Sequence, residues 1–180
     1  TKLNYGLDLA LTFKATEKFK MLLGAGVQHV TFEKPDGGNL DNDQVDLAKY
    51  MFTMEYRFAG PIAAYLSYRH EQRPFYRALL TGATIDSVYI PEIVVGDRLR
   101  LVDSDKTTAW LVTEGLYSFA VNDSNHDINA GYGFLAGFQF DGALEKSKFS
   151  LLPAYRFLKA DTKTSKDQIE AVVLNIQFSW

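Results

Sequence analysis

Charged side chains that could bind ions or transfer protons are spread along strand-like segments rather than gathered in one motif. Those that alternate with apolar residues, and would therefore share the polar face of a sheet, are Asp8, Lys49, Glu55, Arg57, Arg69, Glu71, Arg98, Arg100, Glu114 and Arg156. On the inside of a curled sheet such charges have to be paired. Two interpretations stay open, a salt-bridged plug and a basic-leaning channel or small-ligand site in which Arg57, Arg69, Arg98 and Arg100 attract anions.

A nucleophile and a base are the second candidate for chemistry. Ser67 and His70 are close in the sequence, but a spacing of three on one strand places them on opposite faces. That spacing forbids a direct hydrogen bond between them. We therefore assign no catalytic residue, keep Ser67 and His70 only as candidates for a hydrolase, and interpret His70 as a residue at the rim of the sheet.

The sequence shows no motif for binding a metal, a cofactor or a nucleic acid. There is no cysteine, and His29, His70 and His126 are too far apart to form a metal-ligand motif. The acidic segment 39–46 lacks the glycine and the glutamate that a calcium-binding EF-hand loop requires. The net charge is −3, with no basic stripe. We expect no metal, no cofactor and no nucleic-acid partner.

The segments that carry these charges alternate between apolar and polar residues with a period of two. Leu3, Leu7 and Leu11 belong to the first such run, residues 3–13, which is longer than the 5–6 residues of a common globular strand. Further runs cover residues 19–28, 50–58, 62–71, 93–102, 107–120, 128–141, 149–157 and 172–180. This pattern predicts an all-β fold of nine antiparallel strands, each with one apolar face.

The last strand carries a recognisable signature. Trp180 ends the chain, and Phe178, Ile176 and Leu174 precede it at alternate positions. This arrangement resembles the C-terminal assembly signal of bacterial outer-membrane β-barrel proteins, although it does not indicate a particular family. The resemblance implies a closed antiparallel up-and-down transmembrane β-barrel in the bacterial outer membrane. It also implies contact with membrane lipid and lipopolysaccharide, and recognition by the barrel-assembly machinery.

In that class the last strand runs towards the periplasm, turns there are short and outer loops are long. The class therefore places connections 15–18, 59–61, 103–106 and 141–147 in the periplasm, and 33–44, 73–92, 121–126 and 160–167 outside. Because single-chain bacterial barrels usually have an even number of strands, we expect a tenth strand before Thr1. The chain would then be a single barrel domain, residues 1–180, without that strand and without the signal peptide. In an alternative with eight strands, residues 74–106 form one outer excursion.

Three local features complete the prediction. Trp110 and Val112 fall on one side of the run 107–120 and Tyr117 and Phe119 on the other, which a β-bulge would reconcile. Pro153 predicts a local break in the strand ladder. Aromatic belts are expected at both membrane boundaries, with Tyr50, Tyr68 and Tyr132 at the outer one and Phe13, Phe19, Phe58, Phe140, Phe149 and Trp180 at the inner one.

The function that best fits these expectations is a narrow pore or small-solute transport protein. The alternatives are a structural or partner-binding barrel in an envelope complex, and an outer-membrane lipid-modifying hydrolase. The last departs from the His-x-Ser arrangement of barrel acylhydrolases, since the nearest match, His29-Val30-Thr31, ends in threonine. It also lacks the Asp-x-His of omptin-like proteases. A soluble lipocalin-like barrel is the competing fold, and it would place the aromatic rows inside and the charges outside.

Overall fold

The alternating runs form strands, and the described part of the chain contains no helix. The computed structural model describes residues 5–32, 43–58, 60–79, 82–104, 106–122, 127–144, 147–161 and 166–179, with side chains for a narrower set that ends at residue 155. The strands are β1 (Tyr5–Lys14), β2 (Phe19–Thr31), β3 (Gln44–Arg57), β4 (Ile62–Leu79), β5 (Gly82–Asp103), β6 (Thr107–Ser118), β7 (Val121–Asn122), β8 (Asp127–Ile128), β9 (Gly131–Leu144), β10 (Ser147–Asp161) and β11 (Lys166–Ser179). The predicted all-β class is confirmed.

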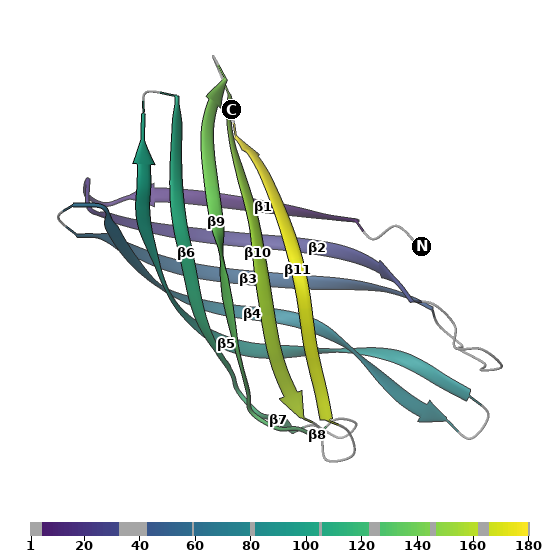
Figure 1. The fold of residues 1–180 in the computed structure, drawn as a ribbon. Coiled ribbons are helices and arrows are strands. Elements are labelled where there is room, and N and C mark those ends of the chain that lie inside the picture. Colours follow the sequence, from purple (N-terminus) through teal and green to yellow (C-terminus); the bar gives the residue numbers. More distant parts are fainter. Residues whose placement is uncertain are drawn as a thin grey trace.

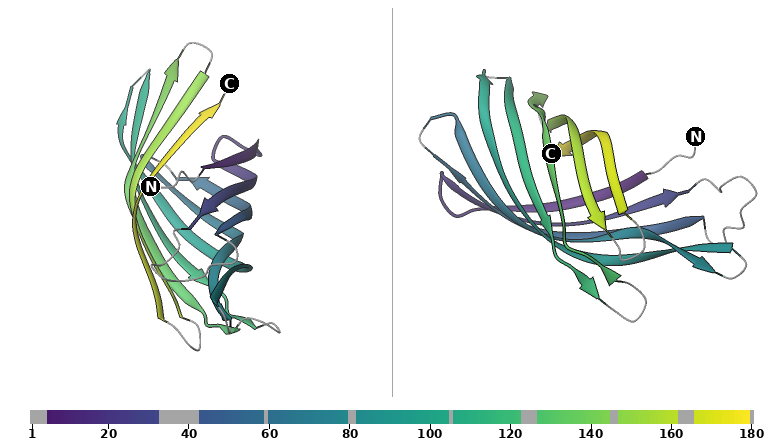
Figure 2. Two further views of the ribbon diagram at one scale, coloured as in Figure 1. Left: turned by 90° about the vertical axis from the view of Figure 1, so that its right-hand side faces the viewer. Right: turned by 60° about the horizontal axis from the view of Figure 1, so that its bottom comes forward.

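Each long strand pairs with its neighbour in the chain. Within the described residues, β1 to β6 and β9 to β11 form one nine-stranded sheet in chain order, and every pairing is antiparallel. The small hairpin β7–β8 is separate from this sheet. The sheet curls strongly, so that β1 and β11 approach the same side (Figures 1 and 2), and it has the form of a half-barrel. Among the described residues β1 is not paired with β11.

One end of the sheet is closed by tight turns at the predicted places. In the first, Thr16 accepts hydrogen bonds through Oγ1 from the backbone N–H groups of Lys18 and Phe19, at 3.2 and 3.0 Å. In the second, Gly60 has a φ of 89°, a conformation that favours glycine. In the third, Ser104 accepts a hydrogen bond from the N–H of Thr107 at 3.1 Å. The side-chain oxygens at the first and third turns satisfy backbone donors that the strands leave unpaired.

The prediction of a long outer loop at 73–92 is wrong. In the structure β4 and β5 continue as a paired hairpin as far as Leu79 and Gly82, and they are 18 and 22 residues long. The strand predicted to begin at Ile93 therefore begins at Gly82. This pairing also excludes the eight-stranded alternative, because residues 82–103 form a full strand between β4 and β6.

Of the two predicted irregularities, one is wrong and one is confirmed. The strand β6 pairs with β9 without a shift in register, so it contains no bulge. The shift lies instead on β5, between Arg100 and Val102. Trp110 is buried and Tyr117 is exposed because they occupy the two faces of a regular strand. At Leu152 and Pro153 the pairing of β10 with β9 is interrupted, as the missing N–H of proline predicts.

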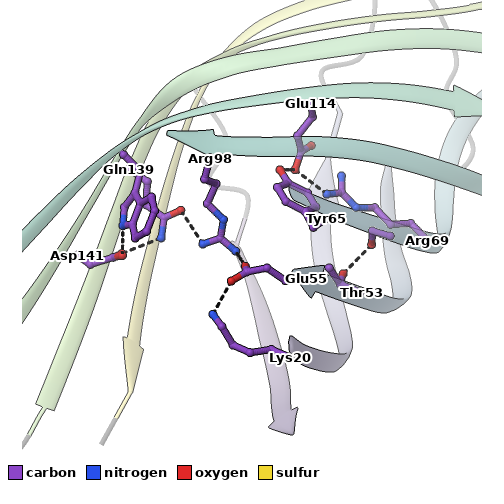
Figure 3. Close-up of polar contacts among 11 residues, drawn as sticks. Lys20, Thr53, Glu55, Tyr65, Arg69, Arg98, Glu114, Gln139 and Asp141 are labelled. Carbon is purple, nitrogen blue, oxygen red and sulfur yellow. Dashed lines mark hydrogen bonds and ion pairs between the residues drawn. The ribbon is translucent and has the colours of Figure 1, made fainter. Parts of the chain in front are cut away.

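The two faces of the curled sheet differ in chemistry. Polar and charged side chains lie within the curve and contact one another (Figure 3). The opposite face carries apolar side chains that are exposed, among them Leu9 at 67%, Val95 at 60% and Tyr132 at 58%. This is the arrangement opposite to that of a lipocalin-like barrel, in which the aromatic rows would face inwards. No helix in the described residues is long and apolar enough to cross a bilayer.

Candidate functional site

The candidate site is the concave face of the sheet, where one row of paired residues crosses the strands. Lys20, Glu55, Tyr65, Gly96 and Glu114 occupy matching positions on β2 to β6. Since paired residues on neighbouring strands project to the same side, the register alone brings these groups to one face. The polar contacts among them and their neighbours are drawn in Figure 3.

Tyr65 crosses its neighbouring strand to reach Glu114. Its hydroxyl donates to Oε1 of Glu114 at 2.7 Å, and Nη2 of Arg69 donates to the same oxygen at 2.9 Å. The strand between them carries Gly96, whose Cβ, if it had one, would overlap the Tyr65 ring. Glycine at this position therefore makes the space through which a β4 side chain contacts β6.

Replacing Gly96 with alanine is expected to lower the free energy of unfolding by about 1–3 kcal/mol, because the added methyl group displaces the Tyr65 ring. Gly115→Ala is the matched control, since a Cβ there meets nothing closer than the Val95 carbonyl oxygen at 3.9 Å. Denaturant unfolding of both variants in detergent measures the difference. Equal stability of the two variants would show that Tyr65 does not depend on this space.

Glu55 is the centre of a second set of contacts. It is 6% exposed, and it forms two ion pairs, one with Lys20 at 2.7 Å and one with Arg98. Arg98 lies on β5, two strands away, and its guanidinium also stacks over the Tyr65 ring at 5.5 Å from the centroid. Both cations are therefore partly neutralised by a single buried carboxylate.

The network continues across β6 to β9 near the turn end of the sheet. The indole N–H of Trp110 donates to Oδ2 of Asp141 at 3.0 Å, and the Gln139 amide donates to Oδ1 of the same residue at 2.7 Å. The guanidinium groups of Arg57 and Arg100 each lie 5.9 Å from the centroid of the Trp110 ring. Trp110 is thus an inward aromatic group held by a carboxylate and contacted by two arginines.

The ion pair between Asp8 and Lys49 also depends on a glycine. Lys49 on β3 forms an ion pair with Asp8 on β1 at 2.8 Å, across β2, where Gly26 stands between them in the register. A side chain at Gly26 would overlap the Asp8 carboxylate. Asp8 and Lys49 are 42% and 41% exposed, so this pair contributes about 0–1 kcal/mol.

The far end of the hairpin β4–β5 buries one further ion pair. Arg73 and Glu92 are 7% and 0% exposed and contact each other. Nearby, Ile128 of β8 packs against Val88 and Ile90 of β5. Arg73 is therefore buried in an ion pair on the inner face, close to where the short hairpin β7–β8 packs on β5.

The predicted charges lie mostly where the alternation put them. Glu71 and Lys49 are paired positions in the register of the inner face. Arg156 occupies the register row of Glu114, through Leu135, but its side chain lies outside the described set. Of the assembly signal, Leu174, Ile176 and Phe178 are backbone positions of β11 whose side chains are not described, and Trp180 lies outside the described residues.

The structure separates the two hydrolase candidates. Ser67 is 1% exposed and shares a hydrogen bond with the Thr53 hydroxyl at 2.7 Å on the inner face. His70 lies on the other face, with its ring 4.8 Å from that of Tyr89. Their expected placement on opposite faces is confirmed, so they do not form a catalytic pair. In the described residues no group of three or more histidine, cysteine or acidic side chains could hold a metal ion.

Several central residues of the site were not predicted, namely Tyr65, Gly96, Glu92, Gln139 and Asp141. The available signal was the glycine at an inward strand position, flanked in the register by a long polar side chain on each neighbouring strand. That signal can be used only once the register is known. No protein-family model, curated protein or solved structure matches this chain.

Proposed function

We propose that the chain is the membrane-embedded part of an outer-membrane β-barrel that acts as a narrow pore or small-solute transport protein. The exposed apolar face carries this proposal. Leu7, Leu9 and Leu11 on β1 are 62–67% exposed, and apolar side chains on β2 to β6 and β9 continue the same face. An apolar surface that extends across β1 to β6 and β9 is unfavourable in water and marks a contact with lipid or protein.

Two groups of aromatic residues support contact with a bilayer. Further from the tight turns, about midway along β3 and β4, Tyr50 and Tyr89 stack with their centroids 6.3 Å apart, and His70 lies against Tyr89. Towards the tight-turn end, Tyr56 and Phe58 pack edge to face at 5.1 Å. Amphipathic rings at both boundaries with aliphatic residues between them are typical of transmembrane barrels.

We propose that the half-barrel closes through one further strand. With nine strands joined by antiparallel pairings, β1 and β11 run in the same direction, so direct closure would pair them in parallel. A tenth strand between them could pair antiparallel with both edges. Closure satisfies the backbone groups of the two edge strands, which hydrocarbon cannot do. Lipid, lipopolysaccharide and the assembly machinery are the partners that this proposal implies.

A structural or partner-binding barrel is the second candidate, and the network on the inner face favours it. Contacts such as Arg98 with Glu55 and Tyr65 with Glu114 join strands that are two apart, and they extend into the space that a pore would need. A small barrel whose interior is filled by side chains conducts poorly. The pore and the structural barrel therefore differ in conductance and share the same fold.

The test is reconstitution of the intact protein in planar lipid bilayers. A pore predicts small, discrete conductance steps, and Arg98→Gln is expected to change their size because it removes one of the two cations paired with Glu55 inside the barrel. Lys106→Gln is the control, since Lys106 is an exposed cation in the turn after β5. Inserted, folded protein without conductance would indicate the structural barrel. Protein that stays monodisperse without detergent and does not insert would contradict both.

A further inference from the structure

The four inner-face arginines that were predicted to attract anions are not equivalent. Arg69 is paired with Glu114 at 2.9 Å, and Arg98 is paired with Glu55, which is almost fully buried. Each of the two already contacts a carboxylate, with which an incoming anion would have to compete. This leaves Arg57 and Arg100 as the arginines that could bind something else.

Arg57 carries a charge that the described residues do not neutralise. It is the last residue of β3, and among the described residues it forms no ion pair. Its Nε is buried and has no hydrogen-bond partner in the part of the chain that the structure describes. A buried donor on a charged group without a partner costs free energy, and a bound ion or water is one of the ways in which native proteins satisfy such a group.

Arg100 reaches the same place from the next strand but one. Its guanidinium and that of Arg57 lie at equal distances, 5.9 Å, from the centroid of the Trp110 ring. Its own carboxylate partner is Asp103, which is 53% exposed and only three residues away. An exposed pair of this kind is weak, so Arg100 can exchange Asp103 for a ligand at little cost.

The aromatic ring that both arginines contact is fixed. Trp110 is 8% exposed, and its indole N–H is held by Asp141 at 3.0 Å. A fixed aromatic face holds a guanidinium in a defined orientation while leaving its N–H groups free to donate. The two guanidinium groups are therefore held in place before an anion binds, which reduces the entropy lost on binding.

We propose that Arg57, Arg100 and Trp110 form a binding site for a small soluble oxyanion, a carboxylate or a phosphate, at the tight-turn end of the inner face. The site deepens the proposed pore function, because it would select anions at one mouth. Guanidinium groups bind such oxyanions with two parallel hydrogen bonds, which chloride cannot accept in the same geometry. The site should therefore prefer acetate and phosphate over chloride.

Trp110 gives a direct readout, because the chain contains only one other tryptophan, Trp180. In a Trp180→Phe background, the protein in a maltoside detergent is titrated with phosphate or acetate against chloride at constant ionic strength. We expect a saturable change in Trp110 fluorescence. Arg57→Gln should raise the half-saturating concentration about tenfold or more, the effect of losing one charge-assisted contact. Lys106→Gln removes a charge at the same end and should leave the titration unchanged.

The outcomes separate the sources of the anion and the two proposals. A fluorescence change that only phosphatidylglycerol in mixed micelles produces would overturn the soluble oxyanion in favour of a lipid headgroup. No saturable change, or the same change in Arg57→Gln, would overturn the site itself. Because the titration requires no conductance, it can succeed in a barrel that does not conduct, and a conducting barrel can fail it.

Discussion

Leu11→Arg is expected to destabilise the folded protein in lipid bilayers by about 2–4 kcal/mol, while Thr12→Arg is expected to change its stability little. The two residues are neighbours on β1, and both are exposed in the structure. Leu11 belongs to the apolar outer face, and Thr12 lies in the register row of Leu22 and Thr53 on the polar inner face. Only lipid on the outer face would distinguish them.

Reversible folding into vesicles of short-chain phosphatidylcholine, followed by denaturant titration, measures both variants against the parent. The same titration of detergent-solubilised protein gives a reference in which the arginine can reach water more easily. Equal tolerance of both arginines would show that the outer face meets water, and the membrane assignment would then be wrong. A larger loss of stability for Thr12→Arg than for Leu11→Arg would show that the inner face, and not the outer one, meets lipid. The membrane assignment would then also be wrong.

Removing the charge of Glu55 has the second largest expected effect. Glu55→Gln leaves Lys20 and Arg98 close together with no carboxylate between them. Breaking a buried pair by removing one partner costs about 3–5 kcal/mol. Because Lys20 and Arg98 retain 27% and 26% of their side-chain exposure, we expect the lower end, about 3 kcal/mol, in the free energy of unfolding.

Asp103→Asn is the control for this variant, because it also removes a carboxylate from an arginine, but at an exposed site. Surface pairs contribute about 0–1 kcal/mol, so this variant should unfold at nearly the parent's denaturant concentration. A small effect of Glu55→Gln, similar to that of Asp103→Asn, would mean that water screens the whole inner face. Such screening would favour the open pore over the filled barrel.

The strands could be predicted from the sequence wherever each face has a single environment. In β1, every second residue from Leu7 to Phe13 is apolar and exposed, and the polar residues between them include Asp8 and Thr12. A period of two over that length has no other regular explanation. The tight turns could be predicted for the same reason, because each interrupts the alternation with residues such as Gly60 and Ser104.

The extension of β4 and β5 could not be predicted because both of its faces change environment. Beyond Tyr68 the outer face becomes polar, with His70 and Gln72, so the sequence there no longer alternates and predicts a loop. On the inner face, Val88 and Ile90 are apolar because Ile128 of the short hairpin β7–β8 covers them. A contact between segments about forty residues apart leaves no local pattern.

The network of the site was predicted only as a set of inward charges. The alternation placed Glu55, Arg57, Arg69, Arg98 and Glu114 on one face, which the structure confirms. It could not show which cation takes which carboxylate, because partners such as Arg98 and Glu55 are separated by another strand. The role of Trp110 could not be predicted, because the sequence alone does not show that its indole N–H has a partner on the inner face.

The crossings above Gly26 and Gly96 have a consequence for how the sheet assembles. In an ordinary meander each strand holds only its immediate neighbours, so strands at an edge can detach one at a time. Here Asp8 ties β1 to β3, and Tyr65 ties β4 to β6. Detaching one of these strands therefore also breaks a contact with the strand beyond its neighbour. The exposed Asp8–Lys49 pair adds little to that cost, so the half-buried Tyr65–Glu114 contact is the one that favours cooperative folding, of β4 to β6.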